Sequence, residues 1–290
     1  MKLIVAGGAA VLLLVVGPAH AQDGDGTSVS AVAPAANPAP LTPAVAPGGA
    51  TKKLLKRLTG SWTYKAENAQ LAAAITASSD LTYQINALTS SGKLTYMEVS
   101  GGTPGQLGGS IPGNGFAFTS GFLADLRSDH PHANIVSNDG PNLLADNTVF
   151  VLGQMAYHMA NDAGADTNAQ ADMQSAIDKA YADAKPGEAP DMTAILNQFS
   201  DSKMRVEAAA FIQGWNDTVD AAARAKGTPL TPQEAASLLM NLRYRSYFLA
   251  AMPKTGETLR FSDDGRIPPD DENLKIMGEA LGKSAVADFQ

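Results

Sequence analysis

The second half of the chain carries apolar residues at intervals of three or four positions, which is the spacing of amphipathic helices. Residues typical of helix starts and helix ends divide this half of the chain into separate predicted helices. Thr167-Asn-Ala-Gln170 and Thr231-Pro-Gln-Glu234 have the form of N-terminal capping boxes, and Gly164, Gly227 and Pro253 are typical helix ends. The predicted helices cover residues 147–163, 168–184, 192–199, 203–226, 232–252 and 271–288. The sequence therefore predicts a mainly α fold, with a single multi-helix domain.

One stretch before residue 145 has the two-residue period of a strand. Leu81, Tyr83, Ile85 and Ala87 alternate with polar residues, and Ser90-Ser91-Gly92 follows as a turn sequence. A second strand is expected over residues 93–99. We therefore predict a small β-hairpin near residues 80–100, preceded by a short helix over residues 67–76.

The N-terminus has the pattern of a secretory signal peptide. Lys2 precedes an apolar run over residues 3–16, and Ala19-His20-Ala21 has the small-x-small form that signal peptidase accepts. The run is shorter than the roughly 20 apolar residues of a membrane span. We predict a signal peptide at residues 1–21 and an exported product, either periplasmic or extracellular. Contact with a membrane is expected if the leader is retained as an anchor.

Residues 22–50 are rich in proline and alanine and contain no aromatic residue, so we expect a disordered tail there. The remaining residues, 51–290, form the predicted helical globular domain. The chain contains no cysteine, so no disulfide can stabilise the exported protein. A domain of this length can fold by burial alone.

The charge of the chain restricts its partners. The formal net charge is −8, and an acidic chain is a poor ligand for nucleic acid. An envelope protein or a small molecule is the expected partner. A local exception is the basic patch Lys52, Lys53, Lys56 and Arg57, which alternates with leucines as on a short amphipathic helix. It could contact a membrane surface or an acidic partner, or it could be the solvated face of a core helix.

A glycine-rich stretch occupies residues 101–115. It lacks the lysine followed by Ser or Thr that a phosphate-binding loop requires, so phosphate binding is not expected. The alternative is a surface loop that contacts a partner. The candidate contact residues in this loop are Gly108, Gly109, Gly113 and Gly115.

Histidines provide one candidate for catalysis. Asp129-His130-Pro131-His132 places two imidazoles in a short loop, and His158 on a predicted helix could complete a three-ligand zinc site. His158 also belongs to a polar stripe with Gln154 and Asp162, which is typical of an exposed helix face. Zinc is thus an alternative to the default expectation that the chain carries no cofactor.

Two functions remain open from the sequence. The first is an exported, non-catalytic helical binding or scaffold protein of the cell envelope, which is favoured because structural signals are plentiful and catalytic motifs are few. The Gly-x-Ser-x-Gly motif of esterases, for example, does not occur. The alternative is an exported metal-assisted hydrolase built around His130, His132 and His158.

Overall fold

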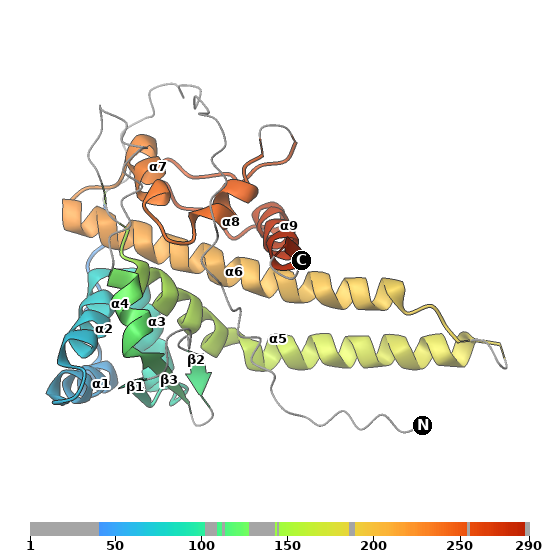
Figure 1. Cartoon of the computed structure of the whole chain (residues 1–290), viewed down its shortest axis with the longest axis horizontal. Coiled ribbons are helices and arrows are strands. Elements are labelled where there is room, and N and C mark those ends of the chain that lie inside the picture. The colour runs from blue at the N-terminus through green and yellow to red at the C-terminus, as the bar shows by residue number, and fades with distance from the viewer. Residues whose placement is uncertain are drawn as a thin grey trace.

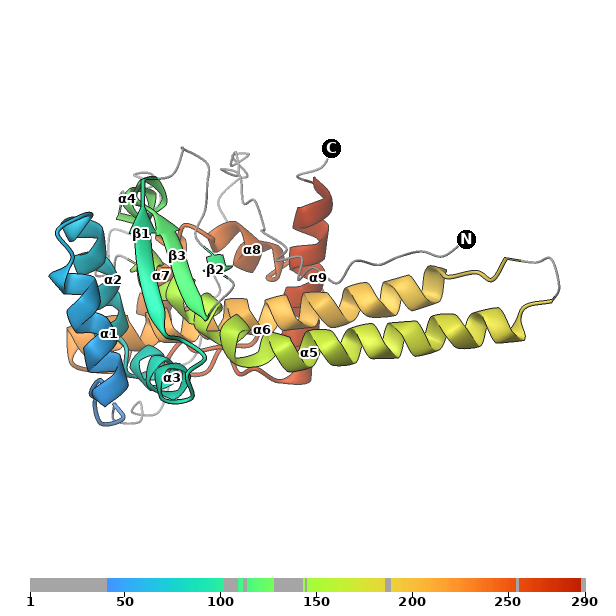
Figure 2. The ribbon, with the colours of Figure 1, turned by 90° about the horizontal axis from the view of Figure 1, so that it is seen from below.

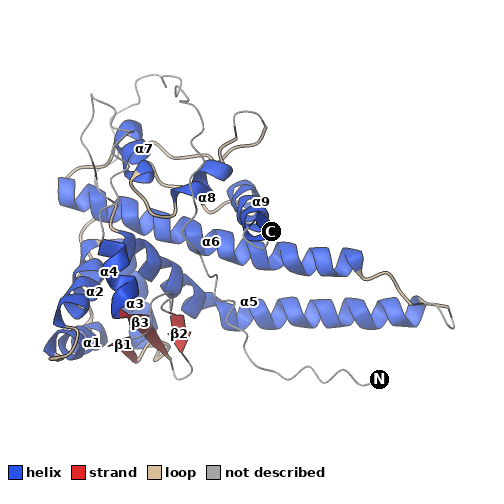
Figure 3. Ribbon diagram, viewed as in Figure 1, coloured by secondary structure: helices blue, strands red, loops and turns tan. Residues whose placement is uncertain are grey.

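A computed structural model of the chain describes residues 41–101, 109–111, 114–127, 143, 145–185, 189–253 and 256–287. Within these ranges the chain is mostly helical, which confirms the mainly α prediction (Figures 1 and 3). The predicted signal peptide and the predicted tail up to residue 40 lie outside the described residues. No helix within these ranges is both long enough and apolar enough to cross a membrane.

The elements fall into two groups along the chain. The N-terminal group contains α1 (Gly49–Gly60), α2 (Lys65–Ala77), α3 (Ser79–Ser90), β1 (Tyr96–Ser100), β2 (Gly109–Ile111), β3 (Gly115–Thr119) and α4 (Ser120–Arg127). The C-terminal group contains α5 (Asn147–Asp183), α6 (Thr193–Lys226), α7 (Pro232–Met240), α8 (Arg245–Ala250) and α9 (Asp271–Ala287). In the sheet, β3 lies between β1, to which it is parallel, and β2, to which it is antiparallel.

Helices α5 and α6 form a long antiparallel pair that organises the molecule. Their inner halves pass through the body, and their outer halves project from it (Figures 1 and 2). We call the part of the pair between Ala156, the last described buried residue of α5, and Ala208, the first of α6, the arm. No described side chain from Tyr157 to Glu207 is fully buried, so the described part of the arm has no core of its own. The arm points away from the end of the body where α1 lies (Figure 2).

Two glycines allow α5 and α6 to cross in close contact inside the body. A Cβ atom on Gly214 would lie 2.5 Å from the carbonyl oxygen of Phe150, and one on Gly153 would lie 3.0 Å from the Cα of Gly214. Aromatic rings surround this crossing. Phe150 stacks on Tyr244 with ring centroids 5.0 Å apart, and the other rings of the cluster are Phe211, Trp215, Tyr247 and Phe248.

The predicted hairpin near residues 80–100 is wrong in its first strand. Residues 79–90 form helix α3, which begins where the hydroxyl of Ser78 accepts a hydrogen bond from the backbone N–H of Leu81. Leu81 and Ile85 are buried, whereas Tyr83 is 67% exposed, which is the helical rather than the alternating pattern. The second predicted strand is present as β1, but its partner is β3 rather than residues 81–87.

Several helix boundaries also differ from the prediction. Helix α5 continues through Gly164, and α6 runs without a break from residue 193 to residue 226. A single glycine costs a helix only about 1 kcal/mol, which packing against a neighbouring helix can offset. The capping box at Thr231 is confirmed, but the helix that it starts ends at Met240, and α8 follows as a separate helix.

The described chain begins before the predicted domain boundary at residue 51. The backbone N–H of Val45 donates to the hydroxyl of Ser79 at 2.9 Å, and the N–H of Gly48 donates to Oδ1 of Asn86 at 2.7 Å. Residues 41–48 therefore lie against α3 and lead directly into α1, which fixes the position of α1 on the body.

Candidate functional site

The four predicted basic residues lie together on α1. Its buried side is formed by Thr51, Leu54 and Leu58, which are at most 4% exposed. The basic residues occupy the intervening positions, so they lie on the outer side of the helix. Their side chains are exposed, and the set comprises Lys52, Lys53, Lys56 and Arg57. The helix is therefore a core element on one side and presents exposed cations on the other, and contact with a membrane or an acidic partner stays a prediction.

Two further exposed residues follow the end of α1 in the chain. Lys65, the first residue of α2, is exposed, and Trp62 in the connecting turn is 94% exposed. We call the exposed side chains of α1 together with Trp62 and Lys65 the basic face. No Asp or Glu occurs between Leu41 and Ala66, so the charge of this segment is entirely positive in a chain of net charge −8.

The turn that presents Trp62 is held by hydrogen bonds from its neighbours. Nδ2 of Asn68 donates to the carbonyl oxygen of Thr63 at 2.9 Å, and the hydroxyl of Ser61 donates to the same oxygen at 3.1 Å. Tyr64 adopts a left-handed backbone conformation, with φ of 53°, and its hydroxyl lies against the backbone of Gly101. The fixed turn leaves the indole of Trp62 in solvent.

A small hollow lies between α1 and β1, beside the basic face. It has a volume of about 180 Å³. The guanidinium of Arg57 donates to the carbonyl oxygen of Thr95 at 2.6 Å, which ties α1 to the chain just before β1. Glu98 is the acidic residue on the strand side of the hollow, and the lining residues are Leu54, Arg57, Leu58, Ser61, Asn68, Tyr96, Met97, Glu98 and Val99.

The structure describes two of the four glycines that were predicted to contact a partner. Gly109 belongs to β2 and Gly115 to β3, whereas Gly108 and Gly113 lie outside the described residues. A Cβ on Gly115 would lie 2.4 Å from the ring of Tyr96, so this glycine allows the ring to pack across the sheet. The structural role of Gly115 is thus clear, and Tyr96 also lines the hollow beside α1.

The predicted metal ligands cannot be assembled from the described part of the chain. Asp129, His130 and His132 lie outside it. His158 is described on α5, where its Nε2 lies 3.3 Å from a carboxylate oxygen of Glu207 on α6. The described residues contain no cluster of three or more potential metal ligands.

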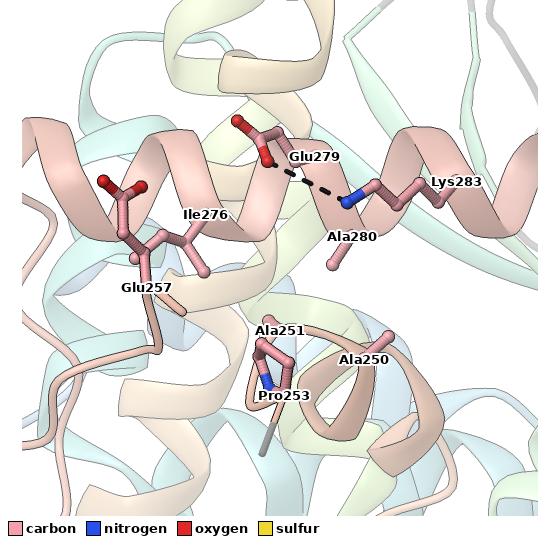
Figure 4. Close-up of a pocket in the computed structure, with 8 residues that line it drawn as sticks. All are labelled: Ala250, Ala251, Pro253, Glu257, Ile276, Glu279, Ala280 and Lys283. Atoms are coloured by element: carbon pink, nitrogen blue, oxygen red, sulfur yellow. Dashed lines mark ion pairs between the residues drawn. The ribbon is translucent and has the colours of Figure 1, made fainter. Parts of the chain in front are cut away.

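A second hollow, of about 310 Å³, lies between α8 and α9 (Figure 4). Small apolar side chains such as Ala250, Ala251 and Ala280 line much of it. On its rim, Glu279 and Lys283 form a long ion pair of 4.0 Å along one face of α9. The lining offers no group of polar side chains that converge on one point, which is what a small-molecule site needs.

Within the described part of the chain, one strongly perturbed acidic group lies inside the body instead. Asp217 is fully buried, and Nε2 of Gln84 donates to its two oxygens at 2.9 and 3.0 Å, while Gln213 donates at 3.0 Å. Burial raises the pKa of the Asp217 carboxyl well above its usual range, and the hydrogen bonds from the two amides oppose this only in part. Asp217 lines neither hollow.

Asp217 should make the stability of the protein depend on pH. Its pKa is higher in the folded than in the unfolded chain, so the folded chain holds the proton more tightly. The resulting stabilisation is complete below the unfolded pKa, near 3.9, and is lost as pH rises through the folded pKa. Asparagine has nearly the shape of aspartic acid and is neutral at every pH. Asp217→Asn should therefore abolish the loss of folding stability as pH rises.

The measurement is the free energy of unfolding in denaturant at a series of pH values. We expect the wild type to lose stability relative to Asp217→Asn as pH rises. Asp80 also has a raised pKa, chiefly through burial, and its charge is one of the causes that raise the pKa of Asp217, so the difference between the two proteins includes the coupling of these acids. Parallel curves for the two proteins would contradict the assignment of Asp217 as the buried neutral acid.

Comparison with known proteins adds no relative from which a role could be inferred. No protein-family model matches the chain, and neither curated proteins nor solved structures include a significant match.

Proposed function

We propose that this chain is an exported, non-catalytic helical binding protein of the cell envelope, and that it contacts its partner through the basic face. The observation that carries the proposal is the combination of clustered exposed cations with a tryptophan that is 94% exposed. Export rests on the signal-peptide pattern of residues 1–21.

An exposed tryptophan next to exposed cations favours the binding of a partner. Tryptophan and arginine are enriched among the residues that dominate binding energies. Trp62 packs so little on its own chain that it contributes almost nothing to the core, and the hydrogen-bonded turn around Thr63 presents it in a fixed position. A preformed surface loses little conformational entropy on binding.

The arm supports a scaffold role. Helix α5 has 37 residues, which corresponds to a length of about 55 Å. The arm extends from the body in the direction opposite to α1 (Figures 1 and 2). A protein held at its basic face would therefore present the arm at a distance from the surface to which it is bound.

Isolated envelopes of an exporting cell provide the test. We expect the purified mature chain to co-sediment with them at low ionic strength, and the triple variant Lys52→Gln, Lys53→Gln, Lys56→Gln to remain in the supernatant. Glutamine has nearly the helix propensity of lysine, so α1 should still form. The matched control is Lys179→Gln, Lys185→Gln, Lys283→Gln, which changes the net charge equally at exposed positions on the arm and α9. Equal retention of both variants would contradict the proposal.

A metal-assisted hydrolase is a second candidate, and one contact favours it. A carboxylate beside a ligand histidine orients the imidazole in many zinc sites, and Glu207 stands in that relation to His158 at 3.3 Å. A stoichiometric divalent metal in the purified protein, lost in His158→Ala, would favour this candidate. A metal-free wild type, or a metal unaffected by the substitution, would count against it.

A further inference from the structure

We infer that the basic face docks on the surface of an anionic phospholipid bilayer, with the indole of Trp62 among the headgroups. This inference rests on the proposed function and names the partner of the same face. It does not require the N-terminal leader to be retained as an anchor.

The cations are arranged for contact with a charged plane. On α1, Lys52 and Lys56 are four residues apart, and so are Lys53 and Arg57, so the charges form two adjacent rows along one side of the helix. The buried Leu54 and Leu58 fix the helix to the body. Each lysine or arginine near an anionic leaflet contributes about 1 kcal/mol, or about fivefold in affinity.

Trp62 supplies an apolar anchor at the end of these rows. Tryptophan favours the interface between water and the bilayer, because its ring is apolar and its indole N–H can still donate a hydrogen bond. The turn is held by Asn68 and Ser61, so the indole is already directed outward before binding. Lys65, three residues after Trp62 in the chain, adds a further exposed cation.

The acidic remainder of the chain does not prevent this contact. Charges more than about 10 Å from the bilayer are largely screened at physiological salt. The arm points away from α1, so its acidic residues are far from a surface that α1 contacts (Figure 2). Near the basic face, Glu98 is exposed in the adjacent hollow, and Glu67 pairs with Arg127 at 3.3 Å. The charge around α1 therefore remains positive.

The composition of the face favours lipid over an acidic protein. A stable protein interface buries more than about 1,000 Å² and has an apolar centre. Here Trp62 is the exposed large apolar side chain beside the cations, and the adjacent hollow is only about 180 Å³. A bilayer needs only clustered cations and an interfacial anchor.

Vesicle co-sedimentation tests the inference. The mature wild-type chain is mixed with vesicles of phosphatidylglycerol and phosphatidylcholine, and with vesicles of phosphatidylcholine alone. We expect binding to the anionic vesicles that weakens with salt.

The variant Lys52→Gln, Lys53→Gln, Lys56→Gln should bind the anionic vesicles about a hundredfold more weakly than the wild type. Trp62→Ala should lose about tenfold, while the control Lys179→Gln, Lys185→Gln, Lys283→Gln should bind like the wild type.

Fluorescence quenching by iodide provides a second readout on the unmodified chain. The chain has two tryptophans, and Trp215 is fully buried, so iodide should quench mainly Trp62 in solution. Anionic vesicles should protect Trp62 from iodide. Absence of binding at low salt, equal binding to neutral vesicles, or equal losses in the lysine variant and the control would overturn the inference.

The two proposals can fail separately. If the chain binds envelopes through the lysines of α1 but ignores anionic vesicles, the partner is an acidic protein or polymer; the lipid inference then fails and the proposed function stands. If neither envelopes nor vesicles bind in a lysine-dependent way, both fail.

Discussion

Replacing Asp220 by alanine is expected to lower the free energy of unfolding by about 3–5 kcal/mol. Asp220 is 1% exposed, and its carboxylate accepts hydrogen bonds from the hydroxyl of Ser78 and, at 2.6 Å, from the backbone N–H of Ser79. It also pairs with Nε of Arg224 at 2.9 Å and with Nη2 of Arg266 at 3.1 Å. Its removal leaves two guanidinium groups and the first turn of α3 without their shared acceptor.

The matched control for this experiment is Asp264→Ala. Asp264 also pairs with Arg266, at 3.4 Å, but its side chain is 40% exposed. Exposed ion pairs contribute at most about 1 kcal/mol, so the control should change stability little. Both variants can be measured by denaturant unfolding. A loss below about 1 kcal/mol for Asp220→Ala would show that the ionic network does not hold α3, α6 and the segment before α9 together.

The second large effect is expected at Trp215. Trp215→Ala should destabilise the fold by about 3–5 kcal/mol, because a large buried ring is replaced by a cavity. The indole is fully buried, its N–H donates to the carbonyl oxygen of Gly265 at 2.8 Å, and its ring lies 5.7 Å from that of Phe248.

The chain contains its own control, because the same substitution at Trp62 removes an indole that is 94% exposed. Trp62→Ala should change the free energy of unfolding by no more than about 0.5 kcal/mol. Similar losses for the two variants would contradict the assignment of one tryptophan to the core and the other to the basic face. Thermal or denaturant unfolding measures both.

The sequence predicts the C-terminal helices well where their signals are local. Thr231 and Glu234 form the predicted capping box, with the N–H of Thr231 donating to the Glu234 carboxylate at 2.7 Å. Gly227 ends α6 in the left-handed conformation, with φ of 85°. Gly164 resembles a stop signal too, but α5 continues through it, because a single glycine costs a helix only about 1 kcal/mol and does not end it on its own.

The predicted hairpin was wrong because a short apolar segment fits two periods. Leu81, Tyr83 and Ile85 alternate as in a strand, whereas Leu81, Ile85 and Leu88 are spaced as in a helix. Ser78 as an N-cap decides between them. This start signal was present in the sequence and could have identified α3.

The candidate site was predicted only in part. The basic residues of α1 could be found from their sequence, because a short amphipathic helix brings them to one side. Trp62 was missed, although it follows Gly60 and Ser61 at the end of the helical pattern, where no core position is expected. The acceptor role of Asp220 could not be predicted, since its partner Ser78 lies 142 positions away in the sequence.

Docking through the basic face is tested most directly by the reactivity of each lysine toward an acetylating reagent, measured with and without envelope membranes. We expect four lysines to lose reactivity when membranes are added, and these are Lys52, Lys53, Lys56 and Lys65. The control lysines, which are Lys179, Lys185 and Lys283, should react as before. Equal changes at both sets, or protection of the arm lysines alone, would contradict docking through the basic face.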